Sequence, residues 1–270
     1  MKSIQFLFII QVICFVIHIS SKIIFYPCDN ENNRHNDISM IICTADRNNK
    51  TTWAERHTNI TNIVMKKRKE DIQILFIGDS ITEKWETIGR DVWDQYYVHR
   101  HALNLGFSGD RIQNVLWRLQ NGEIEKNFQP KAIILMIGTN NIKINNALEI
   151  TKGIISTTRY LHEQMPCTKI ILLGIFPRGL PDSEERRKTI KVNEILSGLV
   201  PFIREPDQWI DYHDIGSVLV EHDCFISKDI MKDGLHPTKK GYQLWAEAME
   251  SFFVFFKYDV KNNNKTNCLN

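Results

Sequence analysis

The sequence carries little excess charge of either sign. Its 34 Lys and Arg residues are nearly balanced by 32 Asp and Glu residues, so the formal net charge is only +2. A chain this balanced lacks the broad basic field that nucleic-acid-binding proteins present, and we expect no nucleic-acid partner. The two local basic runs, at residues 66–69 and 186–188, are interpreted as solvated helix faces.

Cysteines are few and widely spaced. None of the six has a neighbour at the short spacing of a zinc-binding motif, so we expect no metal ion, and the chemistry described below needs no organic cofactor. Cys14 lies in an N-terminal apolar run, and the five cysteines that follow it cannot all pair with one another. Cys28 and Cys43 could close a short loop. Cys167 precedes a predicted strand, where we expect a buried small side chain.

Long apolar runs are also rare, and the one at the N-terminus stands out. Lys2 precedes the apolar segment 4–19, and the small residues Ser20 and Ser21 follow it. This arrangement is typical of a secretory signal peptide over residues 1–21, which predicts a secreted protein. The alternative is an uncleaved signal anchor that would leave the protein attached to a membrane.

Other features near the two ends of the chain agree with secretion. Three sequons place candidate glycosylation sites at Asn49, Asn59 and Asn264, outside the predicted core strands. The polar, asparagine-rich residues 22–50 show no hydrophobic periodicity and are predicted to form a poorly ordered lead-in, and residues 259–270 a disordered tail.

Between these ends, apolar segments alternate with amphipathic ones. The continuous apolar run at 72–77 is typical of a strand buried on both faces. Further strands are predicted at 101–105, 131–137, 169–174 and 209–212. Helices are predicted at 52–67, 91–97, 110–119 with Asp110 as its cap, 146–164, 183–199 and from Pro237 onward. This alternation predicts one domain over residues 51–258, a three-layer α/β/α sandwich with a parallel, flavodoxin-like central sheet.

The residues that follow the first strand are the most informative of the chain. Ser80 comes directly after that strand, at the sheet edge where parallel α/β folds place their sites. It is a candidate nucleophile if a base and a carboxylate can reach it. His236 is the candidate base, and Asp233, three residues earlier, could orient its ring and stabilise the imidazolium. Taken alone, Asp79 and Ser80 could simply cap a following helix.

The loops after the next two strands supply candidate donors for an oxyanion hole. The tetrahedral intermediate of acyl transfer needs hydrogen-bond donors aimed at its negative oxygen. We expect the backbone N–H groups of Ser80 and Gly106 and the side-chain amide of Asn140 to serve. Gly106 is favoured because a residue without Cβ lets its backbone approach substrate closely. Taken singly, Gly106, Gly109 and Asn140 could be only turn residues.

Together these segments resemble, in order, the four signature blocks of the GDSL, or SGNH, hydrolase superfamily. The blocks are Gly78-Asp79-Ser80-Ile81, Gly106, Gly138-Thr139-Asn140-Asn141 and Asp233-Gly234-Leu235-His236-Pro237. The resemblance implies an esterase whose name-giving residues are Ser80, Gly106, Asn140 and His236, with Asp233 completing a triad. Asn141 stands where many members carry Asp, and we expect activity to survive this difference.

Three segments, 107–123, 138–141 and 173–179, further resemble the catalytic subunits of brain-type platelet-activating-factor acetylhydrolase, a likeness that covers roughly residues 52–255. That family implies acetyl esters as substrates, a homodimer and a cytosolic WD-repeat partner, and a signal peptide is inconsistent with the last. Pro237 and Thr238 follow His236 here, which is the general superfamily form of this block and not that of the acetylhydrolase subunits. Acetylated phospholipids and acetylated sugars are therefore both candidate substrates.

We therefore expect a secreted serine esterase that hydrolyses short-chain esters, with acetyl preferred. One alternative is a carbohydrate O-acetylesterase of the same fold. Another is a non-catalytic binding protein on a hydrolase scaffold, since a fold alone does not fix function. A nucleotide-binding domain is disfavoured because no glycine-rich phosphate loop follows the first strand.

Overall fold

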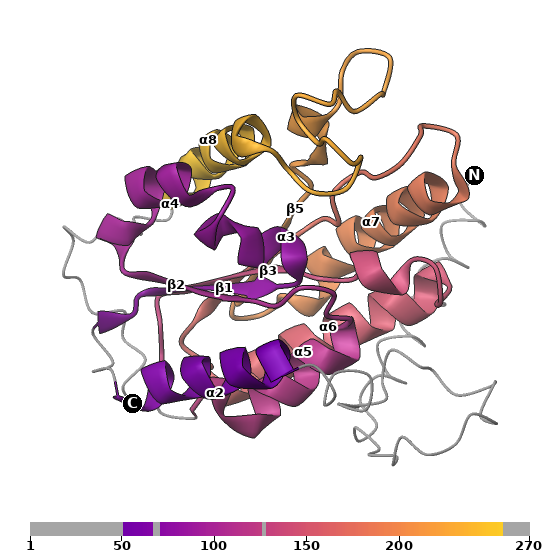
Figure 1. The fold of residues 1–270 in the computed structure, drawn as a ribbon. Helices are drawn as coiled ribbons and strands as arrows, with labels where there is room; N and C mark the ends of the chain where they lie inside the picture. Colours follow the sequence, from indigo (N-terminus) through magenta and orange to yellow (C-terminus); the bar gives the residue numbers. More distant parts are fainter. Residues whose placement is uncertain (1–50, 67–70, 126–127, 256–270) are drawn as a thin grey trace, which may run out of the picture.

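The computed structural model describes residues 51–66, 71–125 and 128–255, which form a central sheet with helices on both sides (Figure 1). The sheet consists of β1 (Ile74–Gly78), β2 (Ala102–Gly106), β3 (Ala132–Met136), β4 (Lys169–Leu173) and β5 (Ile210–His213). Every neighbouring pair is parallel, in the order β2-β1-β3-β4-β5. The predicted α/β/α sandwich with a parallel central sheet is confirmed.

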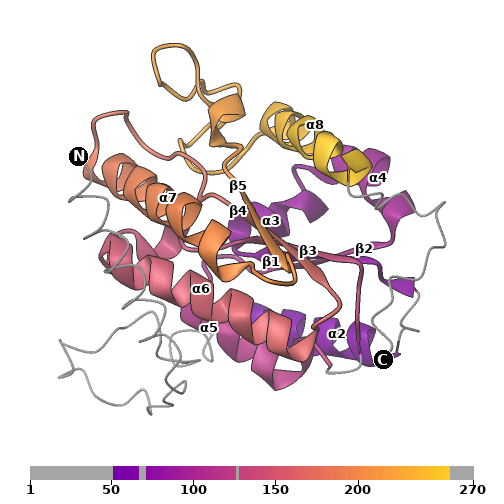
Figure 2. The same ribbon diagram turned by 180° about the vertical axis from the view of Figure 1, so that it is seen from behind.

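Alternate residues of the central strands face two separate hydrophobic cores, because successive side chains of a strand point to opposite faces. Leu75 and Ile77 of β1, with Ile133 and Leu135 of β3, belong to the first core. Four helices cover this face of the sheet (Figure 2). They are α2 (Thr51–Lys66), α5 (Ile112–Arg118), α6 (Ala147–Gln164) and α7 (Glu184–Ile203).

The second core lies on the opposite face. It takes Ile74 and Phe76 from β1, together with aromatic side chains such as Trp85 and Trp245, which pack with ring centroids 4.9 Å apart. The helices on this side are α3 (Ser80–Glu83), α4 (Arg90–Tyr96) and α8 (Lys239–Phe255). Short helical segments complete the fold: η3 (Lys84–Glu86), η4 (Val98–Arg100), η5 (Leu119–Glu123), η6 (Thr139–Asn141) and η7 (Gly216–Leu219).

Most helices begin and end within two residues of the predicted bounds, and two differences have a clear physical cause. α7 continues past residue 199 to Ile203, through Pro201, because Leu199 and Val200 remain buried in the core. Asp110 was predicted to cap α5, and this prediction is wrong. Arg111 occupies the cap position, and its N–H donates to the Asn114 side chain at 3.0 Å. The side chain of Asp110 instead enters a buried ionic cluster.

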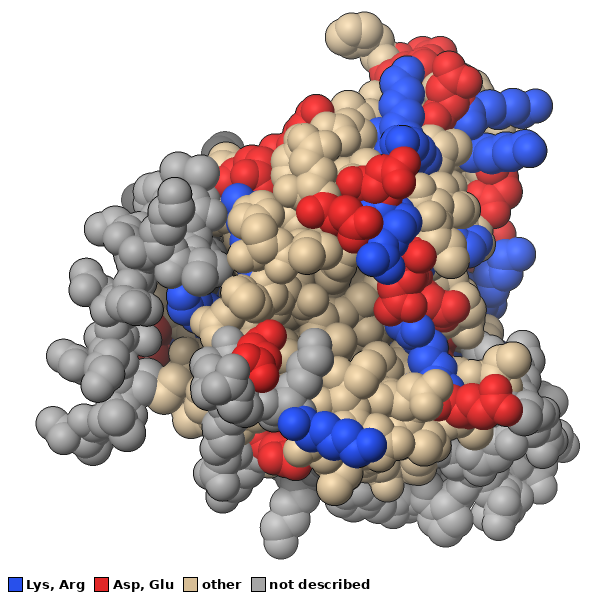
Figure 3. All heavy atoms as spheres, turned by 60° about the vertical axis from the view of Figure 1, so that its left-hand side comes forward, with Lys and Arg blue, Asp and Glu red and all other residues tan. Residues whose placement is uncertain are grey.

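The described surface carries charges of both signs. Figure 3 shows Lys and Arg side chains interspersed with Asp and Glu on one face. Ion pairs join segments that are distant in sequence, including Arg100 with Glu250 and Lys239 with Asp91. Among the described residues, no helix is both long and apolar enough to span a membrane.

Several predictions of the sequence fall outside the described residues. They are the signal peptide at 1–21, the lead-in at 22–50, the tail at 259–270, and the sequons at Asn49 and Asn264. The predicted domain boundary at residue 258 also lies beyond the last described residue.

Gly106 is required by packing, and this can be tested. A Cβ at this position would lie 2.1 Å from the backbone nitrogen of Glu83, which belongs to α3 and cannot yield without moving that helix. We expect Gly106→Ala to lower the free energy of unfolding by about 2 kcal/mol or more. Gly198→Ala in α7 is the matched control, since a Cβ there meets nothing within 4 Å. It should raise stability by about 0.5–1 kcal/mol. Urea unfolding of both variants decides, and a neutral Gly106→Ala would contradict the packing argument.

Candidate active site

Ser80 lies where β1 ends and α3 begins. Asp79 caps this short helix, since its carboxylate accepts a hydrogen bond from the backbone N–H of Ile81 at 2.9 Å. On the far side of α3, the hydroxyl of Tyr242 in α8 donates to the carbonyl of Ile81 at 2.7 Å. The capping role considered for Asp79 is therefore correct, and it coexists with a defined placement of the Ser80 side chain.

The loop before α8 is folded around the carboxylate of Asp233. One carboxylate oxygen accepts from the backbone N–H groups of Leu235 at 3.0 Å and His236 at 2.8 Å. The other lies 2.7 Å from Nδ1 of the His236 ring. Gly234 allows the turn between them, with a φ of +69° that other residues rarely adopt. Because an ionised carboxylate only accepts, Nδ1 carries the proton in this contact.

The remaining ring nitrogen of His236 faces Ser80. Its Nε2 lies 2.8 Å from the Ser80 hydroxyl oxygen, although the two residues are 156 positions apart in the chain. With Nδ1 protonated, Nε2 is the acceptor for the serine proton. The structure thus brings the three predicted residues into one hydrogen-bonded series from hydroxyl to imidazole to carboxylate.

The electrostatics of this series keep Asp233 ionised. Partial burial raises the pKa of its carboxyl group. Hydrogen bonds from the His236 ring and from the backbone N–H groups of His236 and Leu235 more than offset burial and bring the pKa to about 2. The carboxylate is therefore negatively charged at neutral pH, where it can stabilise an imidazolium next to it.

Asn140 lies on η6, which follows β3. Its side-chain nitrogen donates to the backbone carbonyl of Asp110 at 2.8 Å. This bond uses one of the two N–H groups of the amide and fixes the plane in which the second one lies. This bond places Asn140 beside the loop between β2 and α5, at the edge of the sheet where the strands end.

Gly106 has a different task from the one predicted. Its N–H donates to the side-chain oxygen of Asn104 at 2.7 Å, and its carbonyl accepts from Arg56 at 2.8 Å. Its missing Cβ makes room for the backbone of Glu83 rather than for substrate. The prediction that this position requires glycine was correct. A sequence cannot show whether the glycine is needed for helix–strand packing or for close approach to a ligand, because both require a residue without Cβ.

The neighbouring Asn141 is buried and structural. Its side-chain oxygen accepts from the N–H of Ile112 at 3.0 Å, so it anchors the start of α5. Its nitrogen donates to Asn145 at 2.9 Å and to Gln113 at 3.2 Å. An aspartate at this position would lack those two donors, which explains why an amide suits this chain.

Two arginines that were not predicted to belong to the site join its loops. Arg178, in the loop after β4, donates to the carbonyl of Thr139 at 2.8 Å, and the next residue, Gly179, donates through its N–H to the carbonyl of Gly234 at 3.1 Å. The loop after β4 therefore links the Asn140 turn to the His236 loop. The position of this loop, directly after a strand of the parallel sheet, was the sequence feature that could have predicted its part in the site.

Arg186 supports that loop from behind. It is only 4% exposed, so the prediction of a solvated basic run at 186–188 is wrong for its first member. Its guanidinium donates to the carbonyls of Arg178 and Gly179, each at 2.9 Å, and of Cys224 at 3.1 Å.

Cys167 was predicted to be buried, and the structure shows it half-buried.

Within the part of the chain that the structure describes, no group of three or more His, Cys, Asp or Glu residues could hold a metal ion. The polar groups at the strand ends are instead an alcohol, an imidazole, a carboxylate and an amide. These groups suit acyl transfer.

A parallel α/β/α sandwich with this arrangement at its strand ends is typical of the GDSL-type carboxylic ester hydrolases, and the protein is an enzyme of that class. The chain belongs to the GDSL-like lipase/acylhydrolase family, whose model matches residues 76–244.

The curated relatives are similar over most of the chain. Platelet-activating factor acetylhydrolase IB subunit alpha2 of Rattus norvegicus is 35% identical over 190 residues, which are 70% of this chain and 78% of the relative. Subunit alpha1 of Homo sapiens is 32% identical over 203 residues, 75% of this chain and 83% of the relative.

Solved structures share the fold at lower identity. A putative platelet activating factor from Streptococcus pneumonia has a TM-score of 0.61 at 20% identity, covering 74% of this chain and 92% of its own. A putative acylhydrolase from Bacteroides fragilis has the same TM-score at 21% identity, covering 74% and 95%.

Asp79 generates a prediction about pH. Burial raises the pKa of its carboxyl group to about 7, and the nearby charge of Asp110 adds to this, whereas the N–H of Ile81 and the charge of Arg178 oppose it. An aspartate with a folded pKa above its unfolded value of 3.8 binds a proton on folding. Its contribution to stability is therefore present at low pH and lost as pH rises from about 4 to about 7.

We expect Asp79→Asn, which keeps the oxygen that caps α3, to remove this contribution. Urea unfolding of both proteins at about pH 4.5 and about pH 7.5 measures it. The parent should lose about 1 kcal/mol or more relative to the variant at the higher pH. Equal pH dependence in the two proteins would show that Asp79 titrates normally.

Proposed function

We propose that the protein hydrolyses short-chain esters by a Ser-His-Asp acyl-enzyme mechanism. The observation that carries this proposal is the 2.8 Å contact between the Ser80 hydroxyl and Nε2 of His236, with Nδ1 held 2.7 Å from Asp233. Serine is a weak nucleophile on its own, and this arrangement provides the base that activates it.

The reaction has two halves. Ser80 Oγ attacks the ester carbonyl carbon while its proton passes to Nε2 of His236, and the carbonyl oxygen becomes an oxyanion. When the tetrahedral intermediate collapses, the bond to the leaving alcohol breaks and His236 returns the proton to that alcohol. Water, deprotonated by the same histidine, then attacks the acyl-serine. When this second intermediate collapses, the bond to Ser80 Oγ breaks, His236 returns the proton to that oxygen, and the acid leaves. Asp233 stays ionised and stabilises the imidazolium in both halves.

The oxyanion would be held by the N–H of Ser80, the side-chain amide of Asn140 and one donor from the loop after β2. In place of Gly106 we propose the N–H of Gly109 as the loop donor. Gly109 precedes Asp110, whose carbonyl accepts from Asn140, and its φ of +76° turns the chain at this edge of the sheet.

The serine is the sharpest test of this proposal. Ser80→Ala should abolish hydrolysis of p-nitrophenyl acetate and labelling by a fluorophosphonate probe, because both need an activated hydroxyl. Circular dichroism and thermal unfolding should match the parent. A variant that turns over as fast as the parent would refute the mechanism. A parent protein that is folded but neither labelled nor active would instead favour a binding protein on this scaffold.

We further propose acetyl as the preferred acyl group. The support is the name of the curated relatives, platelet-activating factor acetylhydrolase IB subunits alpha1 and alpha2, at 32–35% identity. The substrate would be an acetylated phospholipid, which supplies the phospholipid alcohol as the leaving group, and an acetylated sugar is the alternative.

A panel of esters tests this choice. We expect kcat/KM for acetyl esters to exceed that for butyryl and longer esters of the same alcohol by about tenfold or more, since a pocket shaped for a methyl group excludes longer chains. At constant acetyl, the panel compares an acetylated phospholipid with an acetylated xylo-oligosaccharide. Faster turnover of the sugar would make the protein a carbohydrate esterase, and a preference for long acyl chains would overturn the proposal.

We also propose that the protein is secreted, on the evidence of the apolar segment at 4–19 and the small residues after it. Asn59, the one sequon within the described residues, is exposed on α2, where a glycan could be attached without disturbing the core. An uncleaved anchor is the alternative. A secreted enzyme would not meet a cytosolic WD-repeat partner, whereas a homodimer remains compatible with either location.

A further inference from the structure

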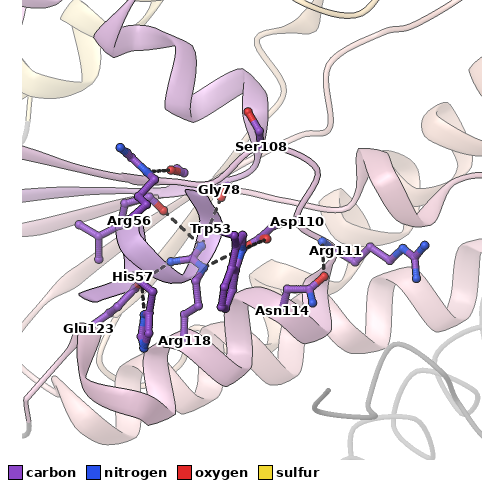
Figure 4. Close-up of polar contacts among 12 residues, drawn as sticks. Trp53, Arg56, His57, Gly78, Ser108, Asp110, Arg111, Asn114, Arg118 and Glu123 are labelled. Atoms are coloured by element: carbon purple, nitrogen blue, oxygen red, sulfur yellow. Dashed lines mark hydrogen bonds and ion pairs between the residues drawn. The ribbon is translucent and has the colours of Figure 1, made fainter. Parts of the chain in front are cut away.

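A cluster of charged side chains is buried directly beneath the strand ends. It consists of Arg118 at the end of α5, Asp110 before that helix, Glu123 after it, and Trp53 and His57 from α2, and Figure 4 shows them converging. We call it the Arg118 cluster. The side chains of Arg118, Asp110 and Glu123 are all 0% exposed.

The bonds within the Arg118 cluster fix its acids individually. Arg118 donates through Nε to one oxygen of Asp110 at 2.7 Å and through Nη1 to Glu123. Trp53 donates its indole N–H to the other oxygen of Asp110 at 2.8 Å. His57 lies 3.0 Å from the second oxygen of Glu123. Both oxygens of the Asp110 carboxylate therefore have a directional donor, and the side chain has little freedom to rotate.

Such a cluster is an expensive way to fill a core. Desolvating three charges opposes folding, and well-packed apolar residues of similar volume are often as stable or more so. A buried ionic cluster is therefore weak evidence for stability. The Arg118 cluster must be judged by what it holds in place.

The Arg118 cluster holds the loops at the carboxyl ends of β1 and β2, next to Ser80 and Asn140. Nη2 of Arg118 lies 3.3 Å from the carbonyl of Leu105 and 3.5 Å from that of Gly78, at the ends of β2 and β1. Its guanidinium stacks 3.8 Å from the centroid of the Phe107 ring. Asp110, gripped through its carboxylate, presents its backbone carbonyl to the side-chain nitrogen of Asn140 at 2.8 Å.

We propose that Trp53 and Arg118 are positioning residues for the oxyanion hole. They immobilise the carboxylate of Asp110, so that its carbonyl orients the Asn140 amide toward the oxygen of the reacting ester. Preorganised donors of this kind stabilise charge that develops in the transition state and contribute little to binding the neutral ester. The inference rests on the proposed esterase mechanism and assigns a catalytic consequence to residues that touch no substrate.

Trp53→Phe is the most conservative test. It removes the donor to Asp110 and keeps a ring against Phe107, whose centroid lies 5.7 Å away. Trp117→Phe is the matched control, because it makes the same exchange at an indole that packs against the rings of Trp53 and His57. We expect Trp53→Phe to lower kcat for p-nitrophenyl acetate about tenfold with KM unchanged within twofold. Trp117→Phe should change neither constant by more than twofold.

A double-mutant cycle with Asn140→Ala separates positioning from general damage to the fold. Asn140→Ala alone should lower kcat by about 10²-fold, as the loss of an oxyanion donor does. If Trp53 acts through Asn140, adding Trp53→Phe to that variant should lower kcat by less than twofold further. A full tenfold loss in the Asn140→Ala background, or no loss in the parent background, would overturn the inference.

Two further measurements keep the outcome decisive. If Trp53→Phe does not fold, Arg118→Lys replaces it in the same cycle with the same expectations. Lysine retains the positive charge and loses the planar guanidinium that donates to several acceptors at once.

If the parent has no esterase activity, the proposed function fails, and the inference is tested through the ¹H–¹⁵N resonances of the Asn140 side-chain amide, assigned by their loss in Asn140→Ala. Trp53→Phe should shift them and Trp117→Phe should not, and unshifted resonances in Trp53→Phe would refute the positioning role.

Discussion

The central constraint on this protein is that β1 and β3 are buried on both faces. Each residue of β1 from Ile74 to Ile77 is at most 1% exposed, so neither face of the strand can carry polar chemistry. The chain can present functional groups only where these strands end. Because all the strands run in the same direction, those ends lie along one edge, and loops from distant parts of the sequence meet there.

Short-range hydrogen bonds then set the geometry of each loop. The Asp233 carboxylate organises its own turn before it contacts the His236 ring, so the acid and base form one local unit. The Asp79 cap does the same for Ser80 at the start of α3. Only the bond between Ser80 and His236 has to form across the fold, and the packing of α3 and α8 in a shared core brings those two units within reach.

Long polar side chains connect the loops to one another. Arg178 joins the loop after β4 to the Asn140 turn, and Gly179 joins the same loop to the His236 turn. On the other side, Arg118 connects the ends of β1 and β2 to Asp110. Hydrogen bonds therefore connect the loops at the strand ends to one another. Within this network, the position of Asn140 depends on groups that lie beneath the surface.

The sequence alone determined the order and type of the main elements, because hydrophobic periodicity reports burial directly. It also determined the residues of the hydroxyl, imidazole and carboxylate series, since Ser80 follows a buried strand and Asp233 and His236 are close in the chain. The tertiary structure alone decided the role of residues whose type fits several tasks. Gly106 serves helix packing, and Asp110 serves a buried ion pair instead of a helix cap. A glycine or an aspartate in a loop looks the same in sequence whichever neighbour it meets, and that neighbour comes from another part of the chain.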